Sequence, residues 1–406
     1  MSLVSLSSGR DLFMTPGPSI MPDRVLNAMH QPAPNIYEGE MIGMTDSILA
    51  DLAELAGTKG KVALYICNGH GVWEAAISNL LEPGGSALFL NSGAFGTSWA
   101  GIGRTMGIDV EEIDFGRCGP IDCQRVEARL RADKGHRIKA VMTVHTDTGS
   151  SVRNDIADLR RALDEAGHPA LLVVDAIASF ACDRYEMDAW GVDVTVTACQ
   201  KGLMTPPGLG YLLLNDRAQE AANQIPFPSP YWDWRSRIEP EVFYQRFYGT
   251  APTHLLFAQR AALDMIVEEG REVVWSRHTA LARAVWAAVT AWGADGPIRC
   301  NIEDTACRSH AVTTIRADGH DMARMRRWCE DQAGVTLGLG LGFDLPEYMG
   351  GKSVFRIGHM GHMNPPMLLG ALATIDTAFK ALDLAHGGGA VERAGESLSK
   401  ASSQAL

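Results

Sequence analysis

The 406-residue sequence predicts an α/β protein with a mainly parallel sheet, helices on both of its faces, and a smaller C-terminal α+β domain. Up to about residue 200, short apolar runs rich in β-branched residues alternate with helical patterns, which is typical of a doubly wound sheet. A helix-rich stretch then covers about 253–293, and shorter strand-like runs follow it. The parts that we expect are an N-terminal arm over 1–25, a large domain over 26–260, a small domain over 261–384 and a disordered tail over 385–406.

Each element follows from the spacing of apolar residues and from the residues that interrupt it. The arm contains a turn-rich run at 15–18, and a helical pattern covers 45–55. Further predicted strands are 62–66, 87–90, 138–144, 171–175, 192–197, 311–315 and 353–357, and further predicted helices are 72–81 and 156–166. The tail is rich in Gly, Ala and Ser, so we expect no structure there. Because parallel strands end at one edge of a sheet, functional side chains are expected at that edge.

The composition argues against several classes of partner. The chain has 36 basic and 48 acidic residues, a net charge of −12, which disfavours binding to nucleic acid or to an anionic membrane. We find no apolar run of membrane-spanning length and no secretory signal, so a cytoplasmic protein is expected. The eight cysteines form no CxxC pair, which fits free thiols in a reducing compartment. His359 and His362 lack further ligands, so no metal is predicted.

Two charged residues stand just past predicted strands. Lys201 follows the 192–197 strand, and a turn is predicted over 206–210 after it. This favours a cleft, where a desolvated amine can form an imine with an aldehyde. An ordinary solvated lysine is the alternative. Asp175 ends an apolar run, and a buried carboxylate there needs a cation, such as a protonated ring nitrogen, or several donors. A helix N-cap or a loop carboxylate fits that position equally well.

Two further features suit anionic groups. The turn at 68–71 contains Gly69 and Gly71, which let the backbone approach a ligand, and amides at a helix N-terminus favour a phosphate. The same turn fits half of a dinucleotide site, although the third glycine of GxGxxG is missing. Arg356 lies among strand-like apolar residues, and its planar guanidinium matches a carboxylate. An internal salt bridge is the alternative there.

Several motifs occur in a fixed order along the chain: 15–19, 68–75, 145–150, 173–179, 190–193 running into 200–201, 248–253 and 355–361. Together they resemble the class V aminotransferases, which are fold-type I enzymes dependent on pyridoxal 5'-phosphate (PLP). Within that family, the alanine–glyoxylate and serine–glyoxylate aminotransferases are the most similar. The resemblance runs from about Met14 to Leu382. It implies a seven-stranded, mainly parallel sheet.

The resemblance also implies roles for individual residues. Lys201 is implied to carry PLP as a Schiff base, and Asp175 to pair with the ring nitrogen, so that the protonated ring acts as an electron sink. The other cofactor-binding residues that it implies are Gly69 and His70 at the phosphate, Gln200 assisting them, Phe95 against the ring and Thr148 near the phenolic oxygen.

Substrate and partner contacts are implied in the same way. Arg356 is implied to hold the substrate carboxylate, in a pocket to which Gly17 and Tyr37 contribute. In the family, the segment with Tyr248 and Thr250 reaches the phosphate of the partner subunit, so a homodimer with active sites at the subunit interface is implied. The implied reaction is a ping-pong transfer between a small amino acid, such as alanine or serine, and glyoxylate or pyruvate.

Departures from the family pattern leave the substrates open. The sequence at 147–151 is unusual for the family, Cys199 stands where serine is frequent, and the segment 34–40 differs from the corresponding family sequences. The same fold also hosts lyases, desulfurases and phosphonate aminotransferases, which remain alternatives. Two further hypotheses belong to other functional classes: a nucleotide-dependent oxidoreductase and a catalytically silent PLP-binding protein.

Overall fold

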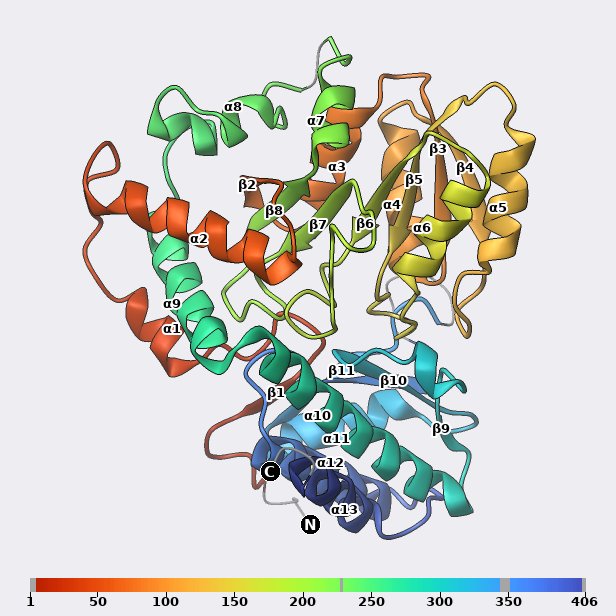
Figure 1. The fold of residues 1–406 in the computed structure, drawn as a ribbon. Helices are drawn as coiled ribbons and strands as arrows, with labels where there is room; N and C mark the ends of the chain where they lie inside the picture. Colours follow the sequence, from red (N-terminus) through yellow and green to blue (C-terminus); the bar gives the residue numbers. More distant parts are fainter. Residues whose placement is uncertain (1–4, 227–228, 344–350, 404–406) are drawn as a thin grey trace.

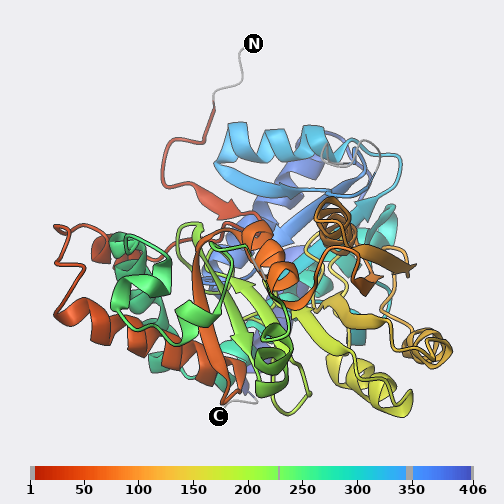
Figure 2. The same ribbon diagram turned by 90° about the horizontal axis from the view of Figure 1, so that it is seen from above.

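The computed structural model describes residues 5–226, 229–343 and 351–403, which are arranged around two sheets. The larger sheet has seven strands and the smaller has five (Figure 1). In both views the C-terminal segments, drawn in blue, lie together beside one end of the large sheet (Figure 2). No helix in these ranges is long and apolar enough to cross a membrane.

The large sheet confirms the mainly parallel arrangement. In spatial order its strands are β2 (Lys61–Cys67), β8 (Gly208–Leu214), β7 (Val194–Ala198), β6 (Leu171–Asp175), β5 (Ile138–Val144), β3 (Ser86–Asn91) and β4 (Asp109–Asp114). Only β8 runs against its neighbours, β2 and β7. The prediction placed a turn over 206–210, but Gly208 and Gly210 belong to β8. A Cβ on Gly210 would lie 2.5 Å from Val72, so the glycine allows a helix to pack closely there.

Helices cover both faces of this sheet, because its strands are apolar on both sides. One face packs against α2 (Glu40–Ala56), α5 (Cys123–Ala132), α6 (Ile156–Glu165) and α9 (Thr253–Glu269). The other packs against α3 (Gly69–Leu80), α4 (Ala94–Thr105) and α7 (Asp216–Ala222). Along β5 the side chains alternate as a period of two requires: Val141 faces the first layer, and Ala140 and Met142 face the second.

The small sheet collects segments from both ends of the chain. Its order is β1 (Leu12–Met14), β11 (Val335–Leu339), β12 (Val354–Gly358), β10 (Val312–Ala317) and β9 (Ile298–Cys300). Strand β1 belongs to the N-terminal arm and pairs in parallel with β11. The helices packed with this sheet are α10 (Arg271–Trp292), α11 (Met322–Ala333), α12 (Pro365–Ala381) and α13 (Ala390–Ser403). Two short helices complete this side of the fold: α1 (Asp23–Ala28) packs against α9, and α8 (Arg235–Ile238) packs against β2 of the large sheet.

The prediction of a disordered tail over 385–406 is wrong for α13. Ala390 and Ala394 are buried in the small-domain core, and Val391 and Leu398 pack against the same cluster. These residues recur at helical spacing, so they form one apolar stripe against α10. The high content of small residues made the segment look like a flexible tail, although its apolar residues were already periodic.

Candidate active site

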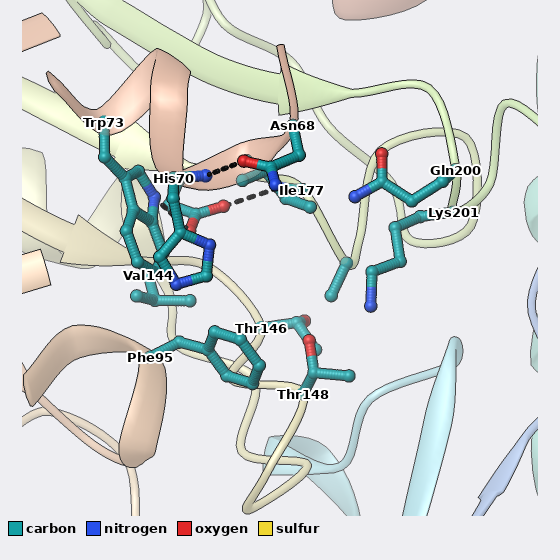
Figure 3. A pocket seen from close by; sticks show the side chains of 13 residues that line it. Asn68, His70, Trp73, Phe95, Val144, Thr146, Thr148, Ile177, Gln200 and Lys201 are labelled. Carbon is teal, nitrogen blue, oxygen red and sulfur yellow. Dashed lines mark hydrogen bonds between the residues drawn. The ribbon is translucent and has the colours of Figure 1, made fainter. Parts of the chain in front are cut away.

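Several strands of the large sheet end at one pocket, as expected from their parallel direction. Its cavity volume is about 140 Å³. The pocket is lined by Asn68, Gly69, His70, Trp73, Phe95, Val144, Thr146, Thr148, Asp175, Ile177, Ala178, Gln200 and Lys201 (Figure 3). Seven of these are predicted cofactor-binding residues: Gly69, His70, Phe95, Thr148, Asp175, Gln200 and Lys201.

Asp175 ends β6 as a buried carboxylate with a donor on each oxygen. Oδ1 accepts a hydrogen bond from the amide of Ile177 at 2.6 Å, and Oδ2 accepts one from the indole of Trp73 at 2.8 Å. Burial raises the pKa of Asp175 to about 7, and the negative charge of Asp147 adds to the rise. The two hydrogen bonds and the charge of Lys201 oppose it. A cation against this carboxylate would therefore be stabilised.

Lys201 follows β7, and its amine lies in the pocket. Nζ donates a hydrogen bond to the carbonyl of Pro16, in the N-terminal arm. Burial lowers the pKa of Lys201 to about 7, with the positive charge of Arg356 as the next cause. Gly17 has a φ of +95°, and a Cβ there would overlap the Lys201 side chain, so the predicted contact of Gly17 with the site is a close backbone approach. A large fraction of this amine is therefore neutral near pH 7.

Arg356 lies on β12 of the small sheet and is buried. Its Nη1 donates to the carbonyl of Thr148 at 2.7 Å, and its Nε donates to the carbonyl of Leu339. Burial lowers its pKa to about 10, which leaves it charged at neutral pH. Within the described ranges no carboxylate forms an ion pair with it, so the salt-bridge alternative finds no partner there. The charge of Asp147 lies near enough to raise the pKa of Arg356, but the hydrogen bonds of its guanidinium in the described structure go to carbonyl groups. Such a cation is suited to bind an incoming carboxylate.

The turn before α3 presents the N-terminus of that helix to the pocket. Asn68 caps the helix, and its Oδ1 accepts from the amides of His70 at 3.1 Å and Gly71 at 3.4 Å. Burial lowers the pKa of His70, so its ring is neutral at pH 7. On the opposite side of the turn, Gln200 Oε1 has no hydrogen-bond partner in the described structure. The N-terminus of the helix suits a polar anion.

Comparison with known proteins decides the family. The model of the family "Aminotransferase class-V" matches residues 40–363. A serine–glyoxylate aminotransferase of Methylorubrum extorquens is 36% identical over 90% of this chain and 90% of its own length. An L-aspartate–glyoxylate aminotransferase of Paracoccus denitrificans is 34% identical over 93% of each. The chain belongs to the class V aminotransferases. The crystal structure of pyridoxamine–pyruvate aminotransferase from Mesorhizobium loti matches 98% of this chain and 100% of its own, with a TM-score of 0.87 and 25% identity.

Five predicted residues of the aminotransferase do not line this pocket. Gly17 and Arg356 lie beside it, against the Lys201 side chain and the carbonyl of Thr148. The other three are Tyr37, Tyr248 and Thr250. Tyr37 is 73% exposed and Tyr248 is 50% exposed, so both stand at the surface of this single chain. Their predicted roles, which for Tyr248 and Thr250 lie in the partner subunit, stay predictions. His359 is buried and bonded on both ring nitrogens, to Thr313 and to the carbonyl of His310, as expected for a structural histidine.

The prediction missed two residues that shape the aminotransferase site. Trp73 lay inside the conspicuous 68–75 motif, but nothing in the sequence connected its indole to Asp175. Asp147 lay in the unusual 147–151 segment. It is fully buried, and its carboxylate accepts from the amides of Phe95, Gly149 and Ser150 at 2.8 to 2.9 Å. Asp147 therefore joins the turn that bears Phe95 to the turn that bears Thr148.

Proposed function

We propose that the aminotransferase uses PLP to transfer an amino group between a small amino acid and a small 2-keto acid by a ping-pong mechanism. One observation carries the proposal. A lysine amine of lowered pKa and a buried carboxylate line one pocket, and an arginine lies beside it, bonded to the carbonyl of the pocket residue Thr148. When bound, PLP supplies an aldehyde for amino groups and a protonated ring that withdraws electrons.

The residues present fit that cofactor. The carboxylate of Asp175 would face the ring nitrogen, whose positive charge offsets the burial that now raises its pKa. The N-terminus of α3 at Gly69 and His70 would face the phosphate. The amide nitrogen of Gln200 points toward Asn68 (Figure 3) and would offer a further donor on this side of the pocket. Phe95 presents an apolar ring to the same space (Figure 3).

The side chains then divide the work of the reaction. The neutral amine of Lys201 takes the proton from the substrate Cα and later returns it. Asp175 in its ionised form holds the proton on the ring nitrogen. Arg356 binds the substrate carboxylate and so orients the Cα–H bond toward Lys201. These three roles need no further titratable group in the pocket.

The two relatives described above support the choice of acceptor, because both are named for glyoxylate although their named donors differ. We therefore propose glyoxylate as an acceptor and serine or alanine as donors. The test mixes the purified holoenzyme with single amino acids and follows loss of its visible absorbance. A rapid loss with serine or alanine, reversed by glyoxylate, is expected. Release of sulfide from cysteine without any keto acid would instead indicate a desulfurase.

Replacing Arg356 with glutamine should lower kcat/KM about 100-fold, because charge-assisted hydrogen bonds to the substrate carboxylate are lost. KM should rise for the amino acid and for the keto acid alike, since both carry that carboxylate. Arg356→Lys should be intermediate, because it keeps the charge and loses the planar fork. Steady-state kinetics with both substrates measure this, and the visible spectrum checks that the cofactor is still bound. Unchanged KM values would contradict the assignment.

A homodimer with shared sites is the assembly that we propose. Three exposed residues with large apolar side chains in one short segment support it, namely Val242, Tyr244 and Tyr248, each at least 46% exposed. Sedimentation should show a dimer. Mixing two impaired variants, Lys201→Ala and Tyr248→Ala, should then restore activity, because a hybrid dimer contains one site with both native residues. Absence of any recovery in a mixture shown to exchange subunits would rule out a shared site.

A further inference from the structure

We infer that Trp73 is a positioning residue that fixes the plane of the Asp175 carboxylate and stabilises its ionised form at the cofactor ring. This inference rests on the proposed function, because it concerns the carboxylate that would pair with the ring nitrogen of PLP. The Trp73 indole comes from α3 and Asp175 from β6, so the contact joins two elements far apart in the sequence.

The geometry holds the carboxylate from both sides. Trp73 Nε1 lies 2.8 Å from Oδ2, while the amide of Ile177 lies 2.6 Å from Oδ1. The Ile177 amide is two residues from Asp175 and follows the local backbone. Trp73 is therefore the side-chain partner that sets the rotation of the carboxylate. Each oxygen keeps further acceptor capacity, which a protonated ring nitrogen can use.

The indole itself is held in place by other aromatic rings. Trp73 is 1% exposed, and its ring stacks on Trp99 with centroids 5.8 Å apart and planes 14° apart. The ring centroid of Trp73 lies 6.3 Å from that of Phe95, in an edge-on arrangement, and 4.7 Å from that of His70. Figure 3 shows Trp73 beside both of them, on the side of the pocket between the turn at 68–71 and Phe95. A side chain packed this way presents its N–H in one direction.

The chemistry of the indole selects one charge state of Asp175. An indole N–H is a donor only, and it bonds more strongly to an ionised carboxylate than to the carbonyl oxygen of the protonated acid. Burial and the nearby charge of Asp147 both favour the protonated acid, and the Trp73 bond opposes them. Trp73 thus lowers the pKa of Asp175 and shifts the group toward its ionised form.

The test compares two ligands on cofactor-free full-length protein: PLP and its carbocyclic analogue, in which CH replaces the ring nitrogen. Trp73→Phe should weaken PLP binding about tenfold, the effect of losing a hydrogen bond to a charged group, and should weaken analogue binding less than about twofold. Equal weakening of both ligands would mean that Trp73 only fills space, and would overturn the inference. If the unaltered protein failed to bind PLP, or bound both ligands equally, the proposed function would fail instead.

Trp99→Phe is the matched control. Trp99 belongs to the same stack and is buried, but its Nε1 has no hydrogen-bond partner in the described structure. This variant removes the same atoms as Trp73→Phe and should leave the ratio of the two dissociation constants unchanged. A change in that ratio as large as that of Trp73→Phe would contradict the role of the hydrogen bond.

A second measurement needs no substitution and covers the case in which Trp73→Phe does not fold. In cofactor-free protein labelled with ¹⁵N, the indole resonance of Trp73 should shift as Asp175 titrates near pH 7. The other eight tryptophans have no bond to this carboxylate and serve as internal controls. If no indole resonance shifted between pH 5 and 9 while the protein stayed folded, the inference would be wrong.

Discussion

Replacing Lys201 with alanine should abolish transamination and remove the visible absorbance of the bound cofactor. A loss of at least about 10⁴-fold in kcat is expected, since both the anchoring amine and the general base disappear together. Absorbance spectra and single-turnover assays measure the two effects separately. Added small amines should restore a little proton transfer, because the cavity left by the side chain admits them. Full turnover in Lys201→Ala would exclude this residue as the base.

The same amine should also be recognisable by its pH dependence in cofactor-free protein. Because the pKa of Lys201 is lowered from 10.5 to about 7, the neutral form appears as pH rises through about 7. Reductive methylation at that residue should therefore be rapid at pH 8, where solvated lysines are still protonated. Peptide mapping after brief labelling measures it, with Lys139, which is exposed, as the internal reference. Equal labelling of the two residues at pH 8 would contradict the lowered pKa.

Replacing Asp175 with asparagine should lower kcat by about 10² to 10³-fold, which corresponds to the cost of leaving a buried charge unpaired. The amide has nearly the same shape, so the bond from Ile177 and the fold should survive, as circular dichroism would verify. A neutral amide cannot stabilise the proton on the ring nitrogen. The rate constant measured under single-turnover conditions should therefore fall, although the cofactor remains bound through Lys201.

A chemical rescue separates charge from packing in this variant. PLP methylated on its ring nitrogen carries a permanent positive charge, and it should restore part of the activity of Asp175→Asn while impairing the unaltered enzyme. If the methylated cofactor gave no recovery although it bound, the role of Asp175 in keeping the ring cationic would have to be abandoned.

Much of the large domain was predictable because short, local sequence patterns indicate its strands. The runs that end at Asp175 and just before Lys201 are apolar and short, so each identifies a buried strand and a polar group at its end. Parallel pairing then brings these ends to one edge without further information. The predicted strands at 138–144 and 171–175 have the bounds that the structure shows.

Features that depend on distant pairing were not predictable in the same way. Glycine and proline near 206–210 indicate a turn, and only the neighbouring helix shows why Gly210 lies in a strand. The Trp73–Asp175 bond spans 102 residues, and no local pattern indicates which donor meets which acceptor. Asp147 is similar: its sequence neighbours reveal the tight turn at Gly149 and Ser150, but its third donor, Phe95, is 52 residues away.

The N-terminal arm has attachments in both halves of the molecule. Its strand β1 belongs to the small sheet that carries Arg356, while Ser19 donates to the carbonyls of Gln200 and Lys201. Between these anchors, the carbonyl of Pro16 receives the amine of Lys201. Any movement of the small sheet relative to the large one would therefore displace a short segment that contacts the lysine. Engagement of a carboxylate by Arg356 and release of the amine from its resting hydrogen bond would be mechanically linked.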